Sequence, residues 1–257
     1  MGSAGSVALA APGKSAESDE PWCEAQTETL PDDVCYFDGG AGKSGAAGKS
    51  GQRRTLVVFL HGVIPPNTTW QWTQHRALVR EAKQLGFAVL MPRAPRRSYG
   101  RKGELYSWPT AVAAQRVEED GLVESWSRAQ KLVESRDGRF DEVFVIGFSS
   151  GAYYASSLAL RGRLDVDGYA FLAGGTSGRA TATARKPIYV GVSARDKQTA
   201  PDARGLGGAL TRWGWPHRVR EEAVGHTVAD VHMAHALGYL RSQPHADHAG
   251  IDRKNTD

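Results

Sequence analysis

From Arg54 onward, short apolar runs alternate with longer stretches in which apolar residues recur at helical spacing. Runs such as residues 56–60 are apolar throughout, which is typical of strands buried on both faces. The predicted strands are residues 34–38, 55–60, 87–91, 142–146, 169–173, 188–192 and 217–223. The predicted helices are residues 72–85, 117–135, 150–160, 202–213 and 228–240. Strands that alternate with helices predict an α/β fold, with one mostly parallel sheet flanked by helices.

The chain has 257 residues, which is enough to bury one substantial core. We predict a single domain over residues 22–242, with a leader or signal remnant at 1–21 and a disordered tail at 243–257. Residues 5–11 resemble the small-residue end of a secretory signal, but no charged start and no full apolar segment precede them. The segment is either the remnant of a replaced signal or a disordered leader. We expect a secreted or periplasmic location, with a cytoplasmic location as the alternative.

Net charge, the length of the apolar runs and the number of cysteines argue against several classes of protein. With 32 basic and 28 acidic residues the net charge is only +4, which does not predict a nucleic-acid partner. No apolar run approaches the roughly 18–20 residues that a membrane-spanning helix needs. The chain has 2 cysteines, too few for a multi-cysteine zinc site, and we expect no metal and no cofactor.

Cys23 and Cys35 allow two interpretations. In an exported protein they would form a disulfide that closes a short loop, whereas in a reducing compartment they would remain two thiols. We favour the disulfide, because both residues lie in an otherwise weakly anchored N-terminal region.

The glycine-rich segment at 39–53 contains Gly-Lys-Ser twice, which superficially suggests a phosphate-binding loop. Such a loop needs a further glycine five residues earlier, and those positions hold Phe37 and Lys43. A strand, rather than the required helix, follows. We therefore interpret the segment as a flexible turn between two strands.

The predicted strand at 142–146 leads into Gly147-Phe148-Ser149-Ser150-Gly151, and a helix begins there. Gly-x-Ser-x-Gly alone is a weak signal, but a strand–turn–helix context makes it a nucleophile elbow. The serine then lies on a sharp, strained turn at a helix N-terminus. We predict Ser149 as a nucleophile.

A serine hydroxyl needs a base, and the base needs an orienting carboxylate. Asp196 follows the predicted strand at 188–192, and His226 follows the next one. Nucleophile, acid and base then occur in the chain order that accompanies such an elbow. Asp202 is a rival for the acid, although its place after Pro201 favours a helix cap.

The segment Leu60-His61-Gly62-Val63 ends another apolar strand beside the elbow. We predict an oxyanion hole formed by the backbone N–H groups of Val63 and Ser150, with His61 bracing the loop. Each of these pieces lies at the C-terminal end of a strand. Together they predict an active serine hydrolase.

These segments resemble the α/β-hydrolase superfamily over roughly residues 54–243, and within it the branch of carboxylesterases, acyl-thioesterases and polyhydroxyalkanoate-depolymerase-like enzymes. The resembling segments are Leu60-His61-Gly62, residues 91–95, Ser107-Trp108, the elbow, residues 194–196 with 199–201, and Gly225-His226. The resemblance implies hydrolysis of carboxylic esters or thioesters through an acyl-enzyme, without a metal.

The substrate-binding surroundings follow less directly. Only residues 174–186 separate two predicted strands where cap domains usually insert, so we expect no large cap and an open site. The expected substrate is a small ester or the end of an ester polymer. Trp70, Tyr106 and Trp108 could form an acyl or aryl subsite, and the basic residues of 93–102 could attract anions. The alternative is a solvated basic loop pinned by its aromatic residues.

Two other functions compete with ester hydrolysis. One is a serine peptidase of the same fold, which the absence of a propeller or large cap disfavours. The other is a non-catalytic binding protein on this fold, although such proteins commonly lose a triad member. No oligomeric state follows from the sequence.

Overall fold

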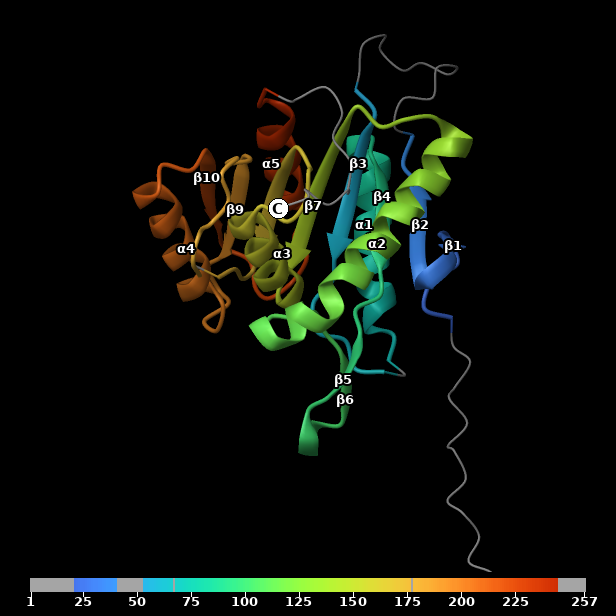
Figure 1. Cartoon of the computed structure of the whole chain (residues 1–257), viewed down its shortest axis with the longest axis horizontal. Coiled ribbons are helices and arrows are strands. Elements are labelled where there is room, and N and C mark those ends of the chain that lie inside the picture. Colours follow the sequence, from blue (N-terminus) through green and yellow to red (C-terminus); the bar gives the residue numbers. More distant parts are fainter. Residues whose placement is uncertain (1–20, 41–52, 67, 177, 245–257) are drawn as a thin grey trace, which may run out of the picture.

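The structure is a computed structural model of the chain, and it describes residues 21–40, 53–66, 68–176 and 178–244 (Figure 1). Nearly all of the predicted leader, of the glycine-rich turn at 39–53 and of the tail at 243–257 lies outside the described residues.

Over these residues the chain forms an eight-stranded sheet in the order β1-β2-β4-β3-β7-β8-β9-β10. The strands are β1 (Glu28–Leu30), β2 (Val34–Asp38), β3 (Thr55–Leu60), β4 (Ala88–Pro92), β7 (Glu142–Phe148), β8 (Gly168–Leu172), β9 (Ile188–Ser193) and β10 (His217–Glu222). Six strands of this sheet run parallel to one another, namely β4, β3, β7, β8, β9 and β10. The other two, β1 and β2, extend the sheet antiparallel to their neighbours. This arrangement confirms the predicted mostly parallel sheet.

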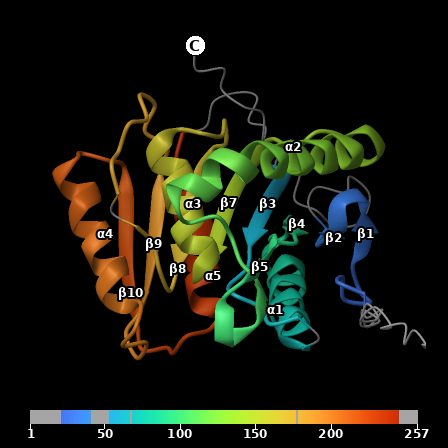
Figure 2. The same ribbon diagram turned by 60° about the horizontal axis from the view of Figure 1, so that its bottom comes forward.

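Helices cover both faces of the sheet (Figures 1 and 2). They are α1 (Trp70–Leu85), α2 (Val112–Asp137), α3 (Ser150–Arg161), α4 (Ala200–Arg212) and α5 (Asp230–Arg241). Alternate residues of β7 enter opposite cores: Val143 and Val145 pack with α2, α3 and α4, whereas Phe144 and Ile146 pack with α1 and α5. Burial on both faces explains why the central strands are apolar throughout.

The segment between β4 and α2 differs from the expected loop. It contains a short antiparallel hairpin of β5 (Arg96–Ser98) and β6 (Glu104–Tyr106), and Tyr106 exchanges two backbone hydrogen bonds with Ile64. The hairpin is thereby attached to the chain that follows β3. Helix α2 also begins at Val112 rather than at 117, and both Val112 and Val117 are exposed there, so the apolar pattern did not reveal this first turn.

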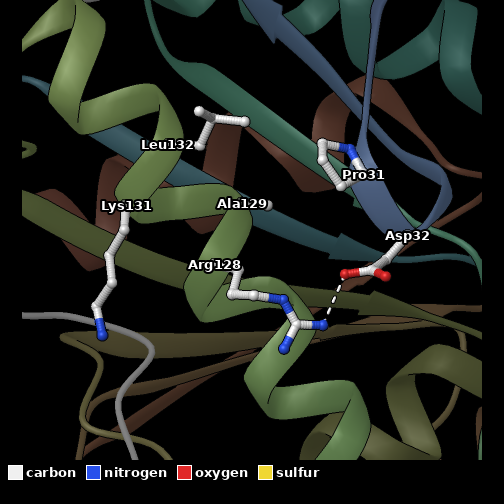
Figure 3. Close-up of a pocket in the computed structure, with 6 residues that line it drawn as sticks. All are labelled: Pro31, Asp32, Arg128, Ala129, Lys131 and Leu132. Carbon is white, nitrogen blue, oxygen red and sulfur yellow. Dashed lines mark hydrogen bonds and ion pairs between the residues drawn. The ribbon is translucent and has the colours of Figure 1, made fainter.

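A cavity of about 330 Å³ lies between α2 and the turn that follows β1 (Figure 3). Its lining residues are Pro31, Asp32, Arg128, Ala129, Lys131 and Leu132, and Arg128 forms an ion pair with Asp32 at 2.7 Å. None of the predicted site residues lines it. No helix among the described residues has the length and apolar character needed to span a membrane.

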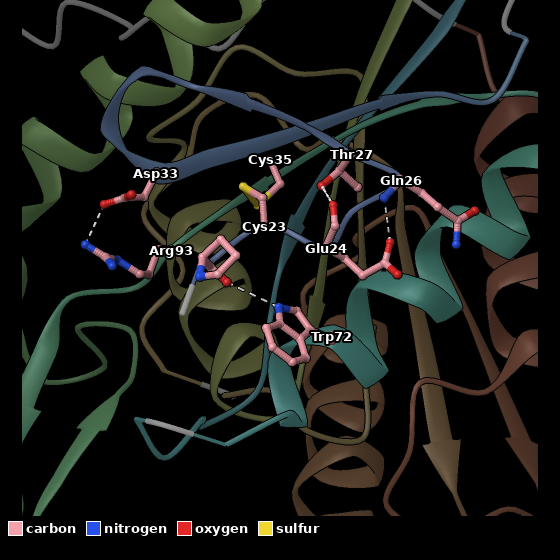
Figure 4. The surroundings of a disulfide bond; sticks show 9 residues. Cys23, Glu24, Gln26, Thr27, Asp33, Cys35, Trp72 and Arg93 are labelled. Atoms are coloured by element: carbon pink, nitrogen blue, oxygen red, sulfur yellow. Dashed lines mark hydrogen bonds and ion pairs between the residues drawn. A yellow bond between two sulfur atoms is a disulfide. The ribbon is translucent and has the colours of Figure 1, made fainter. Parts of the chain in front are cut away.

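Cys23 and Cys35 are joined by a disulfide, with their Cα atoms 5.4 Å apart (Figure 4). Cys35 lies on β2, so the bond attaches the chain before β1 to the sheet. Both cysteines are buried.

Replacing both cysteines with serine is expected to lower the free energy of unfolding by about 3 kcal/mol, because the unfolded chain regains the freedom of the closed loop. Urea unfolding of the double variant and of the oxidised wild type measures the difference. Equal unfolding midpoints and slopes would contradict this expectation.

Candidate active site

Ser149 lies between the end of β7 and the start of α3, as the sequence predicted. Its backbone has φ 52° and ψ −118°, a conformation that costs free energy for a residue with a Cβ. A Cβ on Gly147 would lie 2.3 Å from the carbonyl oxygen of Gly151, and one on Gly151 would lie 1.9 Å from that of Leu60. Glycine at both positions therefore permits α3 to start in contact with β3 and β7.

The structure brings Ser149, His226 and Asp196 together at the C-terminal edge of the sheet. The Oγ atom of Ser149 lies 2.9 Å from Nε2 of His226, and Nδ1 of His226 lies 2.5 Å from Oδ2 of Asp196. Asp196 follows β9 and His226 follows β10. A continuous chain of hydrogen bonds thus connects residues 149, 226 and 196.

Asp196 has several donors besides the imidazole. Its Oδ1 atom accepts from the N–H groups of Gln198 at 3.1 Å and Thr199 at 3.3 Å, and its Oδ2 atom accepts from the Thr199 hydroxyl. Burial raises the pKa of Asp196, but the hydrogen bonds from Thr199 and His226 outweigh it and hold the pKa below its ordinary value. The carboxyl group is therefore ionised at neutral pH.

An ionised carboxylate only accepts hydrogen bonds, so the Nδ1 atom of His226 must carry the proton that it shares with Asp196. In the neutral form of the ring, the Nε2 lone pair then faces the Ser149 hydroxyl. The ring of His226 packs against Phe148 with 4.9 Å between centroids, and its side chain remains 40% exposed. Ser149 thus lies beside the Nε2 atom of an imidazole that is accessible from solvent.

Asp202 occupies neither of the roles considered from the sequence. It lies in the first turn of α4, whose N-cap residue is Thr199, and its carboxylate accepts a hydrogen bond from the Tyr153 hydroxyl. Thr199 was missed as a partner of Asp196. Its spacing of three residues from an aspartate at a helix start is a usable signal.

Three contacts fix the loop of residues 61–64 after β3. The N–H of Gly62 donates to Oε1 of Gln74 at 3.0 Å, the carbonyl of Gly62 accepts from Nδ1 of His61, and the N–H of Ile64 donates to Tyr106 at 3.0 Å. The C=O and N–H of a trans peptide point in opposite directions. The bond from His61 to the Gly62 carbonyl therefore sets the direction of the Val63 N–H.

The N–H groups of Val63 and Ser150 have no hydrogen-bond partner among the described residues. Ser150 is the first residue of α3, where N–H groups lack intrahelical acceptors. A Cβ on Gly62 would lie 3.3 Å from the Cβ of Ser149, so the loop and the elbow are adjacent. Ser150 thus follows Ser149 in the chain, and Val63 follows the glycine that lies against Ser149.

His61 links two loops as a neutral ring. Its Nδ1 atom donates to Gly62, and its Nε2 atom accepts from the N–H of Ala94 at 3.0 Å. Burial lowers the pKa of His61 to about 4, although the hydrogen bond to Gly62 partly opposes this. The ring is 1% exposed, and its two nitrogens bond Gly62 and Ala94 rather than Ser149. The position agrees with the expected bracing role.

The three predicted substrate contacts lie in different surroundings. Trp70 is exposed and Tyr106 is half-buried, but Trp108 is only 1% exposed. Trp108 stacks on Tyr154 and donates its indole N–H to the carbonyl of His61 at 2.8 Å. The expectation for Trp108 is therefore corrected: the ring supports the loop from inside the core and cannot contact a substrate here.

The basic residues near the hairpin are largely neutralised. Arg93 pairs with Asp33, Arg96 with Glu104, and Arg97 with Glu118. These three ion pairs weaken the attraction of anionic substrates that the sequence suggested, because each of these positive charges has an acidic neighbour. No group of three metal-ligating side chains occurs among the described residues.

No protein-family model matches the chain, and no curated protein matches it in sequence. Several solved structures are similar to it in fold. A structure of YahD with malic acid has a TM-score of 0.56 and 17% identity, covering 82% of this chain and 99% of that one. A carboxylesterase from Mesorhizobium loti has a TM-score of 0.55 and 21% identity, covering 85% and 100%. A Bacillus cereus carboxylesterase has a TM-score of 0.54 and 14% identity, covering 84% and 94%.

These likenesses establish the fold. The order of the strands, the strand–turn–helix around Ser149 and the solved structures agree on one class. The chain has the α/β-hydrolase fold.

The buried histidines behind the loop predict a pH-dependent stability. Burial lowers the pKa of His75 to about 3, and neither ring nitrogen has a hydrogen-bond partner within the described part of the chain. The unfolded chain, with histidine pKa near 6.5, then binds more protons between about pH 6.5 and 4, so the free energy of unfolding falls as the pH drops through that window.

A His75→Phe variant is expected to lose about 2 kcal/mol less than the wild type between pH 7 and 4.5, since one buried imidazole no longer has to stay neutral. Urea unfolding of both proteins at each pH measures this. Parallel pH dependences would contradict the expectation.

Proposed function

We propose that the chain is a serine hydrolase that cleaves carboxylic esters or thioesters through an acyl-enzyme. The observation that carries the proposal is the hydrogen-bond chain from Ser149 through His226 to the ionised Asp196. The named carboxylesterases among the similar structures add support for an esterase.

In the proposed acylation, the Ser149 Oγ attacks the acyl carbon while its proton passes to Nε2 of His226. The negative charge on the carbonyl oxygen is stabilised by the N–H groups of Val63 and Ser150. When the tetrahedral intermediate collapses, the bond from the acyl carbon to the leaving oxygen of an ester, or to the leaving sulfur of a thioester, breaks. The departing alcohol or thiol takes the proton from His226.

Deacylation repeats these steps with water. His226 accepts a proton from the attacking water, the ester bond to Ser149 breaks, and the serine recovers its proton. Asp196 stays ionised throughout and stabilises the imidazolium that forms twice in each cycle. Thr199, which donates to Asp196, holds the carboxylate in place as a positioning residue.

The test of this function is Ser149→Ala with p-nitrophenyl acetate as substrate. The variant is expected to lower kcat by about 10⁴-fold or more, because no nucleophile remains. Covalent labelling by a fluorophosphonate, present in the wild type and absent from the variant, identifies the serine independently. Equal turnover in both proteins would exclude Ser149, and cleavage of peptides but not esters would favour a peptidase. Binding without turnover would favour a non-catalytic protein.

The site is proposed to be open to small esters or to the ends of ester polymers. No helix occurs among the described residues between β8 and β9, where a cap could insert. The disulfide adds support for a secreted or periplasmic location, since such bonds persist in oxidising compartments.

An open site predicts the absence of interfacial activation. The rate with p-nitrophenyl butyrate or tributyrin is expected to follow dissolved substrate smoothly, because no lid has to move at a lipid–water boundary. Rates measured below and above the solubility limit provide the test. An abrupt increase at that limit would reveal a moving cover and contradict the proposal.

A further inference from the structure

Residues 21–23, which we name the N-terminal strap, lie outside the part of the sequence that resembles α/β-hydrolases. Yet Trp22 of the strap is only 7% exposed. Its ring contacts His61, His75 and Tyr106, with centroid separations of 5.2, 5.4 and 5.3 Å. An indole from outside the resembling region thus packs beneath the loop that carries Val63.

Separate contacts hold the strap in this place. Cys23 is bonded to Cys35 on β2, and the carbonyl of Pro21 accepts from the indole N–H of Trp72 on α1 at 3.3 Å (Figure 4). The guanidinium of Arg93 lies 6.0 Å from the Trp22 ring. The strap is therefore fixed on both sides of Trp22 by covalent and polar contacts.

His61 is the link between Trp22 and the loop. The ring of His61 lies between Trp22 and Trp108, with Trp108 at 5.1 Å, while its two nitrogens bond Gly62 and Ala94. Water that reached His61 would compete for the Gly62 carbonyl. Since this carbonyl and the Val63 N–H belong to one peptide plane, rotation of that plane would turn the N–H as well.

We propose that Trp22, held by the Cys23–Cys35 disulfide, is a positioning residue for the oxyanion hole that acts through His61 on the Val63 N–H. This inference rests on the proposed serine hydrolase. According to this proposal, the N-terminal strap raises kcat by holding the oxyanion hole in place.

The primary test compares Trp22→Ala with the wild type on p-nitrophenyl acetate. Losing an oxyanion donor costs about 10²–10³ in rate, and a misplaced donor costs part of that, so we expect kcat to fall about 10- to 100-fold with KM changed less than about twofold. Trp22→Phe, which keeps an aromatic ring over His61, is expected to recover most of kcat. Rates are normalised to the fraction of enzyme that a fluorophosphonate finally labels.

A matched control separates positioning from general destabilisation. Trp215 is also buried, and its indole N–H donates to the carbonyl of Lys186 at 2.6 Å, before the starts of β9 and β10 and so at the opposite edge of the sheet. Trp215→Ala is expected to lower the unfolding midpoint while leaving kcat per labelled site within about twofold of the wild type.

A double-mutant cycle tests the route through His61. If Trp22 acts through that ring, Trp22→Ala is expected to lower kcat less than about twofold in a His61→Ala background. Independent, multiplicative effects of the two substitutions would overturn the route. The double variant Cys23→Ser/Cys35→Ser, which keeps every ring in the cluster, is expected to have a kcat between those of the wild type and Trp22→Ala.

The remaining outcomes are decisive as well. Wild-type kcat in Trp22→Ala, together with loss of turnover in Ser149→Ala, would overturn the positioning role and leave the hydrolase intact. No difference between Ser149→Ala and the wild type would overturn both. If Trp22→Ala fails to fold, the double cysteine variant decides the matter, and wild-type kcat there would overturn the proposal.

Discussion

The close approach of α3 to β3 and β7 is the constraint on which the arrangement of the site depends. It is possible because Gly147 and Gly151 lack side chains where a Cβ would overlap backbone carbonyl oxygens. The approach forces the residue between strand and helix into a positive φ, and Ser149 occupies that position. The unfavourable backbone conformation is compensated by the packing of α3 on the sheet, through residues such as Ala152 and Ala155.

The parallel sheet brings the other parts to the same edge. Because β3, β7, β9 and β10 run in one direction, the segments that follow them meet at the carboxyl ends of the strands. Asp196 and His226 are 30 residues apart in the chain but share a direct hydrogen bond. The hydrogen bonds from Thr199 and His226 hold the pKa of Asp196 below its ordinary value, and the Nε2 side of the imidazole remains free to exchange a proton.

The sequence predicted the central strands and the contacts of Ser149, His226 and Asp196 because these depend on local patterns and chain order. It did not predict β1 or the β5–β6 hairpin, whose strands are short and, in the hairpin, rich in arginine and glutamate. It also misjudged Trp108, and it did not predict the ion pairs of Arg93 and Arg97. Their surroundings come from distant segments, such as Asp33 and Glu118, whose approach no local pattern indicates.

The direction of β2 explains why an N-terminal extension can reach the loop after β3. In the antiparallel pair with β4, Val34 lies opposite Pro92 and Cys35 opposite Met91, so β2 begins at the edge where β4 ends. That edge also carries Ala94, which bonds His61. Had β2 run parallel to β4, its first residues and the disulfide would lie at the opposite edge. The antiparallel addition of β2 therefore places Trp22 beside His61. The contact between these two rings follows from the sheet topology together with the Cys23–Cys35 disulfide.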